Sequence, residues 1–490
     1  MDLALRTPHP ARAQPGVRAS AERRQLTVMF CDLAGSTELA SRLDPEDLRE
    51  VVGAVLRRLT EVVMAFNGFV ADYMGDGALV YFGYPEAHEN DAECAIRAAL
   101  QAAEEVSALS LLNGYRPHVR IGIATGLVVV GATGGTGIDA IRNAAGATPN
   151  LAARLQALAE PGAVVVAPST HALAGRLFEY RDLGPVSLKG FSEPVRAWQV
   201  IGTAPAESRF EAQHDTSLAP LVGREEEMAV LSDLWRQTTR QGKGRVVMLS
   251  GEPGVGKSRL TAMLMERLTG EAHIRLRYFC SPHLQGSPLH PCIQQLERAA
   301  GFTRGDSPAR KLERLEAALL RSINSIEDIA LFADLLSLPT GERYPKLHFS
   351  PQKRKEKTME ALVKQLDLLS RQQPVLMIFE DAHWSDPTTR DLLPLAVDLI
   401  AQRPIMLIVT FRPEFQAAWS SRKHVSAIVL RPLPREESAV LVEQIAGAGR
   451  LPREVLEDIV DRSDGVPLYI EELTKAVLEA SAQDERLQDM

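Results

Sequence analysis

The chain has 490 residues, too many for one ordinary hydrophobic core, so its length predicts two or three domains. Its 45% hydrophobic and 24% charged residues argue against global disorder, and a net charge of −8 gives no electrostatic reason to expect nucleic acid or an anionic membrane as a partner. No apolar stretch has the length of a membrane span, the N-terminus lacks the apolar segment of a signal peptide, and the four cysteines lack metal-ligand spacing, so we expect a cytoplasmic location.

The N-terminal part alternates short apolar strands with helices. Residues 1–22 mix Pro, Arg, Ala and Ser and predict a disordered tail, and residues 23–203 predict one domain. Gly75-Asp76-Gly77 marks a hairpin, because tight turns need residues that tolerate positive φ. The predicted strands are Gln25–Asp32, Phe69–Met74, Ala78–Tyr84 and two around Val119–Gly131; the predicted helices are Glu46–Phe66, Ala92–Ala108 and Pro149–Leu158.

A polar, unpatterned segment at residues 204–219 predicts a linker, and residues 220–490 predict a second domain. Apolar strands at Val246–Ser250, Val375–Phe379 and Ile405–Thr410 are separated by long helical patterns. This alternation is typical of a parallel α/β sheet with crossover helices.

Two carboxylates of the first domain stand where the backbone presents side chains. Asp32 ends the first strand, and Asp76 lies in the hairpin turn. Adjacent strands would bring both to one sheet edge and form a hard-oxygen site for Mg²⁺ or Mn²⁺. Taken alone, Asp76 would be interpreted as a turn former.

The segment Leu33-Ala34-Gly35-Ser36-Thr37 follows the first carboxylate and begins a helix. The unbonded amides and positive dipole end of a helix N-terminus suit a triphosphate. Taken alone, Ser36 would be interpreted as a helix cap.

FCDLAGST, MGDGALVYFG and TPNLAARLQALAEPGAVVV together resemble the class III adenylate and guanylate cyclases. The resemblance implies an α+β, ferredoxin-like core and a head-to-tail homodimer with active sites at the subunit interface. It also implies that Asp32 and Asp76 of one subunit hold two metal ions, while Asn150 and Arg154 of the other contact the ribose and the transferring phosphoryl group. Lys189 would contact the terminal phosphates. The implied reaction converts ATP into 3′,5′-cyclic AMP and pyrophosphate.

One pair of residues departs from the adenylate cyclase pattern. Asp72 stands where the family resemblance implies a Lys donor to adenine N1, and Asn143 stands where it implies an acceptor for the adenine amino group. An ionised Asp is an acceptor only, and guanine offers N1–H and N2–H₂ donors. Adenine is the first choice and guanine the alternative; Asp72 pairing with an arginine is a third explanation.

GEPGVGKS in the second domain follows a predicted strand and opens a helix, which is the context of a phosphate-binding P-loop. Gly251, Gly254 and Gly256 let backbone amides surround the phosphates. Lys257 would reach the β- and γ-oxygens, and Ser258 would bind Mg²⁺ of ATP.

VLMIFEDAHWSD places acidic residues after an apolar strand, as a Walker B motif does. Either acid could serve the metal, and the family arrangement implies Glu380 for the metal and Asp381 for the attacking water. With LVGRE, TFRPEF and GVP, the segment resembles the signal-transduction ATPases with numerous domains. In that resemblance Arg412 senses the γ-phosphate and Pro467 packs near the adenine; a helix-capping or salt-bridge role for Arg412 is the alternative.

The sequence therefore predicts a purine nucleotide cyclase regulated by an ATP-binding domain and by an unidentified partner protein. A weakly catalytic or non-catalytic nucleotide-sensing protein is the alternative from another class. Relatives in the second resemblance continue beyond GVPLYIEEL, so we also expect that this chain is shortened at its C-terminus.

Overall fold

The computed structural model describes residues 22–88, 90–111, 114–130, 146–191, 193–204, 221–303, 305–320, 325–341, 343–447 and 449–488. The chain divides into two compact units, Met1–Gln213 and His214–Met490, which are called unit 1 and unit 2 below. Residues 1–21 of the predicted tail and residues 205–219 of the predicted linker lie outside the described residues.

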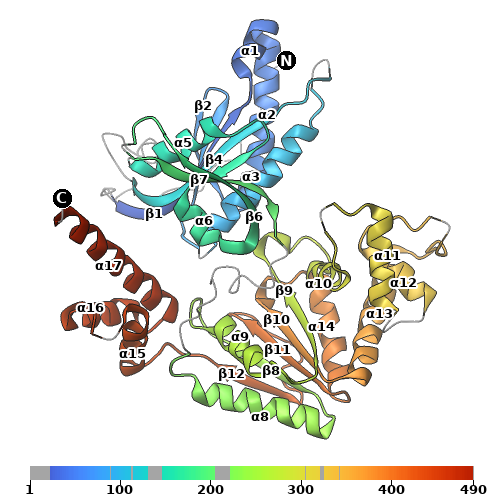
Figure 1. The fold of residues 1–490 in the computed structure, drawn as a ribbon. Helices are drawn as coiled ribbons and strands as arrows, with labels where there is room; N and C mark the ends of the chain where they lie inside the picture. Colours follow the sequence, from blue (N-terminus) through green and yellow to red (C-terminus); the bar gives the residue numbers. More distant parts are fainter. Residues whose placement is uncertain are drawn as a thin grey trace, which may run out of the picture. The chain divides into compact units, whose positions relative to one another are not determined.

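Unit 1 is built on a seven-stranded mixed sheet in the order β2-β3-β1-β4-β5-β7-β6 (Figure 1). The predicted hairpin is present, because β2 and β3 pair in antiparallel fashion around a turn at Gly75 and Asp76. The elements are β1 (Glu22–Leu33), α1 (Ser36–Arg42), α2 (Pro45–Ala65), β2 (Phe69–Met74), β3 (Gly77–Phe82), α3 (Asp91–Ala108), β4 (Val119–Val130), α5 (Ala147–Leu158), β5 (Val164–Val166), α6 (Pro168–Ala174), η2 (Gly175–Leu177), β6 (Phe178–Val186) and β7 (Val195–Thr203).

Strand β1 separates two apolar layers. Met29 and Cys31 pack with α2 and α3, while Leu26 and Val28 pack with α5. Successive side chains of a strand point to opposite faces, so Asp32 shares the α5 face with Val28. The alternation of β1 therefore decides which helix can reach its terminal carboxylate.

The prediction of two strands around Val119–Gly131 was wrong, because β4 is one continuous strand of 12 residues. It pairs with β1 along its whole length, from Leu33 opposite Val119 to Glu22 opposite Val130. Gly122 and Gly126 interrupt the apolar pattern without interrupting the backbone pairing. The long partner strand fixes the conformation that the local pattern left open.

Unit 2 contains a five-stranded parallel sheet in the order β12-β8-β11-β10-β9 (Figure 1). Strands β10 and β11 are buried throughout, and the apolar side of α14 packs on the sheet. The strands are β8 (Arg245–Ser250), β9 (Ile274–Phe279), β10 (Val375–Glu380), β11 (Ile405–Phe411) and β12 (Val425–Val429). The helices are α8 (Glu225–Gln241), α9 (Lys257–Arg267), η3 (Pro282–Leu284), α10 (His290–Ala300), α11 (Pro308–Leu319), α12 (Ile326–Leu335), α13 (Pro351–Gln372), η4 (Ala382–Trp384), α14 (Pro387–Ile400), α15 (Arg435–Ala446), α16 (Arg453–Ser463) and α17 (Pro467–Gln488).

The α/β class predicted for the chain, with a mixed-sheet first domain and a parallel-sheet second domain, is confirmed. Sequence patterns had not predicted β9 and β12, which are the two edge strands of unit 2. Edge strands are partly exposed and carry polar residues, such as Arg275 and Arg277 in β9. Their apolar signal is therefore weaker than that of the buried central strands.

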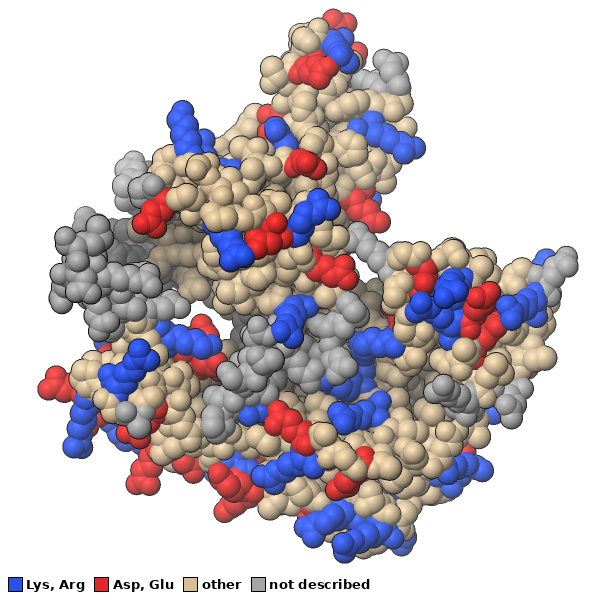
Figure 2. Space-filling view, viewed as in Figure 1, with Lys and Arg blue, Asp and Glu red and all other residues tan. Residues whose placement is uncertain are grey.

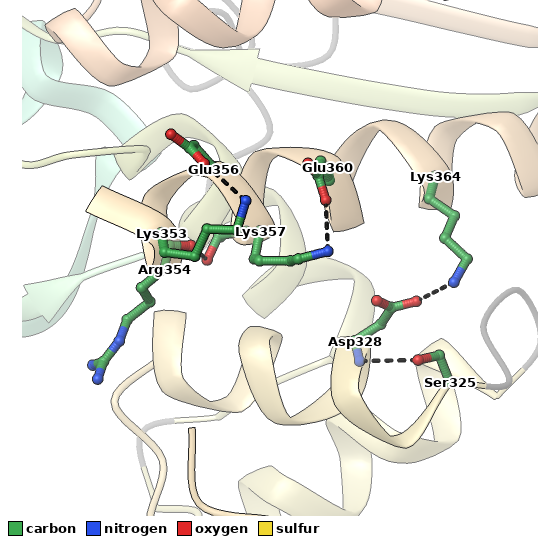
Figure 3. A network of polar contacts seen from close by, with 9 residues as sticks. Ser325, Asp328, Lys353, Arg354, Glu356, Lys357, Glu360 and Lys364 are labelled. Atoms are coloured by element: carbon green, nitrogen blue, oxygen red, sulfur yellow. Dashed lines mark hydrogen bonds and ion pairs between the residues drawn. The ribbon is translucent and has the colours of Figure 1, made fainter. Parts of the chain in front are cut away.

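Helix α13 is attached to its neighbours by ion pairs near the surface. Lys364 Nζ lies 2.6 Å from the Asp328 carboxylate of α12, and the Asp328 amide donates to the Ser325 hydroxyl that caps that helix (Figure 3). Lys and Arg side chains are interspersed with Asp and Glu over the face of the molecule shown in Figure 2. Within the described ranges, no helix has both the length and the apolar character needed to cross a bilayer.

Candidate active site and nucleotide-binding site

The register of β1 and β3 brings Asp32 and Asp76 of unit 1 together. Asp32 lies opposite Gly77, the residue after Asp76, and Asp76 stands in the β2–β3 turn. Gly75 adopts φ 66°, a left-handed conformation that glycine reaches at little cost. The end of β1 and the β2–β3 turn thus place the two carboxylates close together at one end of neighbouring strands.

Two side chains that the sequence analysis did not identify hold the Asp32 carboxylate. Its Oδ2 accepts hydrogen bonds from an Arg120 guanidinium nitrogen at 3.2 Å and from Gln156 Nε2 at 3.3 Å. Arg120 lies directly opposite Asp32 in the β1–β4 pair, and Gln156 comes from α5. Both partners are far away in the sequence, so the strand register reveals Arg120 and the packing of α5 on the sheet reveals Gln156.

The electrostatics and the donor set of this pair fit a divalent cation. Burial, and next the negative charge of Asp76, raise the pKa of the Asp32 carboxyl, while Arg120 opposes the rise. Asp76 Oδ2 is buried and has no hydrogen-bond partner among the described residues. A hard cation would satisfy this oxygen and relieve the repulsion between the two carboxylates. Among the described residues, no third His, Cys, Asp or Glu side chain joins this pair in a group that could hold a metal ion.

The loop after β1 offers fewer free amides than its sequence predicts. The Ala34 amide donates to the His118 carbonyl at 2.8 Å, so it is not available to a phosphate. Gly35, at φ 73°, precedes α1, and Ser36 is the first residue of that helix instead of its cap. The first hydrogen bond of α1 runs from the Leu39 amide to the Gly35 carbonyl. The amides of Ser36 and Thr37 come earlier in the chain than this bond.

The other predicted cyclase residues that the structure describes occupy α5, the β6–β7 connection and β2. Asn150 and Arg154 are exposed on α5, and Lys189 is exposed in the connection between β6 and β7. Asp72 lies at an irregularity in the β2–β3 register, where its Oδ1 accepts a hydrogen bond from the Tyr73 amide at 2.9 Å. Asn143 lies outside the described residues.

In unit 2, the P-loop connects β8 to α9. Gly254 and Gly256 adopt φ 72° and 101°, and a Cβ at Gly251 would lie 2.9 Å from the Leu430 carbonyl, so the loop needs glycine at these positions. The Lys257 side chain is buried and bends back into the loop, where Nζ donates to the carbonyls of Gly251 and Glu252.

The acids after β10 have different surroundings. Glu380 is buried; it accepts hydrogen bonds from the Ser258 hydroxyl at 3.2 Å and from Arg277 of β9 at 2.9 Å. Burial raises the pKa of Glu380, and Arg277 opposes this effect. Asp381 has φ 57°, and its amide donates to the Thr410 hydroxyl. The fold therefore brings Glu380 into direct contact with Ser258 of the P-loop.

Two more predicted residues of unit 2 lie at the ends of their elements. The Arg412 guanidinium, directly after β11, stands 5.1 Å from the centre of the Trp384 ring. Pro467 begins α17, and the next amide, that of Leu468, donates to the Gly254 carbonyl of the P-loop at 3.3 Å. The start of α17 therefore contacts the phosphate-binding loop directly.

Two domain family models match separate segments of the chain. The family described as "Adenylate and Guanylate cyclase catalytic domain" matches residues 19–202, and "AAA ATPase domain" matches residues 220–409. An uncharacterized protein of Rhizobium meliloti (strain 1021) is 32% identical over 465 residues, which are 93% of this chain and 44% of that protein. Adenylate cyclase type 10 of Mus musculus is 24% identical over 493 residues, which are 93% of this chain and 28% of that protein.

The crystal structure of the adenylyl cyclase CyaB from P. aeruginosa aligns with 38% of this chain and 97% of its own chain, at 27% identity and a TM-score of 0.35. The present chain spans less than half the length of the two curated relatives. Both of those alignments extend across unit 1 and unit 2.

Proposed function

Because the chain joins an adenylate and guanylate cyclase catalytic domain to an AAA ATPase domain, we propose that it converts ATP into 3′,5′-cyclic AMP and pyrophosphate under the control of its second domain. The carboxylate pair in unit 1 carries this proposal. Asp32 and Asp76 meet at one sheet edge, and Asp76 Oδ2 is buried without a partner among the described residues. Such a pair is costly in a folded protein unless a cation binds it.

Two Mg²⁺ or Mn²⁺ ions held by Asp32 and Asp76 would activate the ribose 3′-hydroxyl and neutralise the phosphates. Asn150 would orient the ribose, and Arg154 would stabilise the charge that develops on the transferring phosphoryl group. Both are exposed and four residues apart on α5, so they share one helix face and can serve a second subunit. A homodimer formed through unit 1 would complete each site.

Unit 2 would bind Mg–ATP and pass its nucleotide state to unit 1. Lys257 would leave the loop carbonyls for the β- and γ-phosphates, while Ser258 and Glu380 would hold the metal ion. Asp381 would face the attacking water and Arg412 the γ-phosphate. The contact between Leu468 and Gly254 supports a route from the loop to α17, with Pro467 near the base.

A cyclic-nucleotide assay on the full chain, with Mn²⁺ and Mg²⁺ separately, tests the reaction. We expect cyclic AMP from wild type and a loss of at least about a hundredfold in Asp76→Asn, which keeps the side-chain shape but removes the charge. Lys257→Ala should abolish ATP binding at unit 2 and leave the carboxylate pair intact. Nucleotide binding by wild type without any cyclic product would instead support the nucleotide-sensing alternative.

Subunit mixing tests the homodimer. Asp76→Ala and Arg154→Ala chains are each expected to be inactive, and a heterodimer of the two regenerates one intact site. Random exchange makes half of the dimers heterodimers, so activity should approach about a quarter of the wild-type level. Failure to recover despite confirmed exchange would place both residues in the same site of one chain.

A guanylate cyclase is the second candidate, because Asp72 places an acceptor where adenine N1 would need a donor. Asp72→Lys should then shift the ATP-to-GTP ratio of kcat/KM toward ATP by about tenfold or more, as one charge-assisted hydrogen bond predicts. Adding Asn143→Asp should extend the shift. An unchanged ratio would show that neither residue contacts the base.

A further inference from the structure

Side chains of helix α5 face in two different directions. Asn150 and Arg154 are exposed, whereas Gln156 is only 8% exposed and faces the sheet of its own unit. There its Nε2 donates to Asp32 Oδ2 at 3.3 Å. One helix therefore bears residues proposed for the partner's site and a residue that contacts the metal ligand of its own chain.

The close approach of α5 to the sheet depends on Gly122 of β4. A Cβ at this position would lie 2.2 Å from the Ala152 carbonyl oxygen and 2.2 Å from the Gln156 amide nitrogen. No side chain fits in that space, so the α5 backbone at Gln156 rests directly on β4. This backbone contact brings the side-chain amide of Gln156 within hydrogen-bond distance of Asp32.

The two oxygens of Asp32 have different surroundings. Oδ2 accepts from Arg120 and Gln156, while Oδ1 lies on the side of Gly77, 3.5 Å from where its Cβ would stand. Gly77 directly follows Asp76, so Oδ1 lies against the start of the strand that follows the second carboxylate, on a different side from the two donors to Oδ2. A neutral amide orients a carboxylate without adding a positive charge that would compete with a cation.

We propose that Gln156 is a positioning residue that fixes the Asp32 carboxylate for metal binding in its own chain and ties that ligand to the helix bearing Asn150 and Arg154. The inference rests on the proposed cyclase function, which it deepens. In a dimer, each α5 would then connect one active site through Gln156 to the other through Arg154. Gln156 touches neither nucleotide nor metal in this scheme and acts through Asp32.

Mn²⁺ binding tests the proposal without catalysis. Free Mn²⁺ is titrated by electron paramagnetic resonance against the full chain with 3′-deoxy-ATP, which lacks the hydroxyl needed for cyclisation. Every chain in this titration carries Lys257→Ala, because the P-loop of unit 2 would otherwise bind Mn²⁺ with the analogue as well. Gln156→Leu should weaken Mn²⁺ binding about three- to tenfold, the range of a net hydrogen bond, and leave the affinity for metal-free nucleotide unchanged. Gln101→Leu is the matched control, because Gln101 bonds only locally to Glu105 on the exposed side of α3.

If Gln156→Leu does not fold, Gln156→Asn keeps the amide, shortens its reach and should weaken Mn²⁺ in the same way. Mn²⁺ affinity equal to wild type in a folded variant overturns the proposal. If the Lys257→Ala chain with an intact Gln156 binds no Mn²⁺ with the analogue, and wild type makes no cyclic nucleotide, the proposed function itself is refuted. These two results are distinguishable.

Mixed dimers separate positioning from a general disturbance of α5. When Arg154→Ala chains are mixed with Asp76→Ala chains, the intact site takes its metal ligands from the first chain and Arg154 from the second. Adding Gln156→Leu to the Arg154→Ala chain should raise the Mn²⁺ concentration needed for half-maximal activity by the same three- to tenfold. Adding it to the Asp76→Ala chain should leave that concentration unchanged. An effect only from the second combination would mean that Gln156 supports the shape of α5 and not Asp32.

Discussion

The two units hold an acidic side chain at a strand end in the same way but at different depths. Asp32 of β1 is paired with Arg120 of the adjacent strand β4, and Glu380 of β10 is paired with Arg277 of the adjacent strand β9. The first pair is 27% and 32% exposed, and the second is 5% and 10% exposed. A neutral donor completes each acid, Gln156 in unit 1 and Ser258 in unit 2.

Because the two ion pairs differ in burial, we expect the two arginines to differ in their contribution to stability. Water screens the pair of unit 1, so Arg120 contributes little to folding, and the orientation of Asp32 is its main effect. The pair of unit 2 has little water, and a buried carboxylate without a partner is strongly unfavourable. Burial is the main cause that raises the pKa of Glu380, and Arg277 is the main group that opposes it. We therefore expect Arg277 to stabilise unit 2 even without a bound metal ion.

The largest loss of stability is expected when the buried ion pair between Arg277 and Glu380 is broken. Arg277→Met should lower the free energy of unfolding of unit 2 by about 3–5 kcal/mol, because it leaves Glu380 buried and unpaired. Urea unfolding followed by the fluorescence of the buried Trp235 and Trp419 measures this loss. Arg275→Met, two residues earlier on the same strand and exposed, is the control. Equal losses in both variants would show that the pair with Glu380 does not stabilise the unit.

A smaller loss of stability is expected in unit 1 when α5 is moved away from β4 without any change to Arg120. Gly122→Ala should cost about 1–3 kcal/mol, because its Cβ meets the backbone of α5 and the helix must move away from β4. The shift should also weaken Mn²⁺ binding, since it withdraws Gln156 from Asp32. In Gly53→Ala, a helix interior position, the new Cβ meets only the end of the Arg57 side chain, so this control should be neutral or stabilising. A neutral Gly122→Ala would mean that α5 does not rest on β4 at this point.

Features that depend on local sequence were predictable, and features that depend on strand neighbours were not. The hairpin at Gly75, the strand that carries Asp32 near its end and the P-loop each follow from short patterns of glycines and apolar residues. Arg120 and Arg277 are separated from their acids by 88 and 103 residues, so only the sheet order and register reveal them. No local pattern distinguishes these arginines from solvated ones.

The same limit applies to residues that bond inside the protein. Gln156 lies in a helical pattern where a polar side chain is ordinarily exposed, and only the contact at Gly122 shows why it is buried. The sequence predicted a free amide at Ala34. The His118 carbonyl that accepts its hydrogen bond lies far away in the sequence, just before β4, so no local pattern indicates this bond. Long-range packing therefore decided which of the candidate groups remain accessible.

Arg120→Met should change stability less than either preceding variant. We expect a loss of about 1 kcal/mol or less in the unfolding of unit 1, because the pair with Asp32 is partly exposed. Arg120 Nε is buried without a partner among the described residues, so removing the side chain also relieves a desolvation cost. Hydrogen exchange of the β1 and β4 amides in urea reports on this unit, because the tryptophan fluorescence of the chain also includes the three tryptophans of unit 2. A loss near that of Arg277→Met would contradict the link between depth and stability.

The smallest effect extends the comparison to the surface. In the pair of Lys364 and Asp328 that joins α13 to α12, the lysine is 52% exposed and the carboxylate 14% (Figure 3). Lys364→Met should cost about 0.2–1 kcal/mol, because an exposed ammonium gains little from one carboxylate. Asp328 lies in the first turn of α12, where the helix dipole stabilises negative charge after the lysine is removed. Hydrogen exchange of the α12 amides at low and at high salt measures the change. The difference from wild type should shrink at high salt, because a surface pair is screened over about 3 Å at 1 M ionic strength. A loss that exceeds that of Arg120→Met and persists at high salt would show that exposure does not rank these three ion pairs.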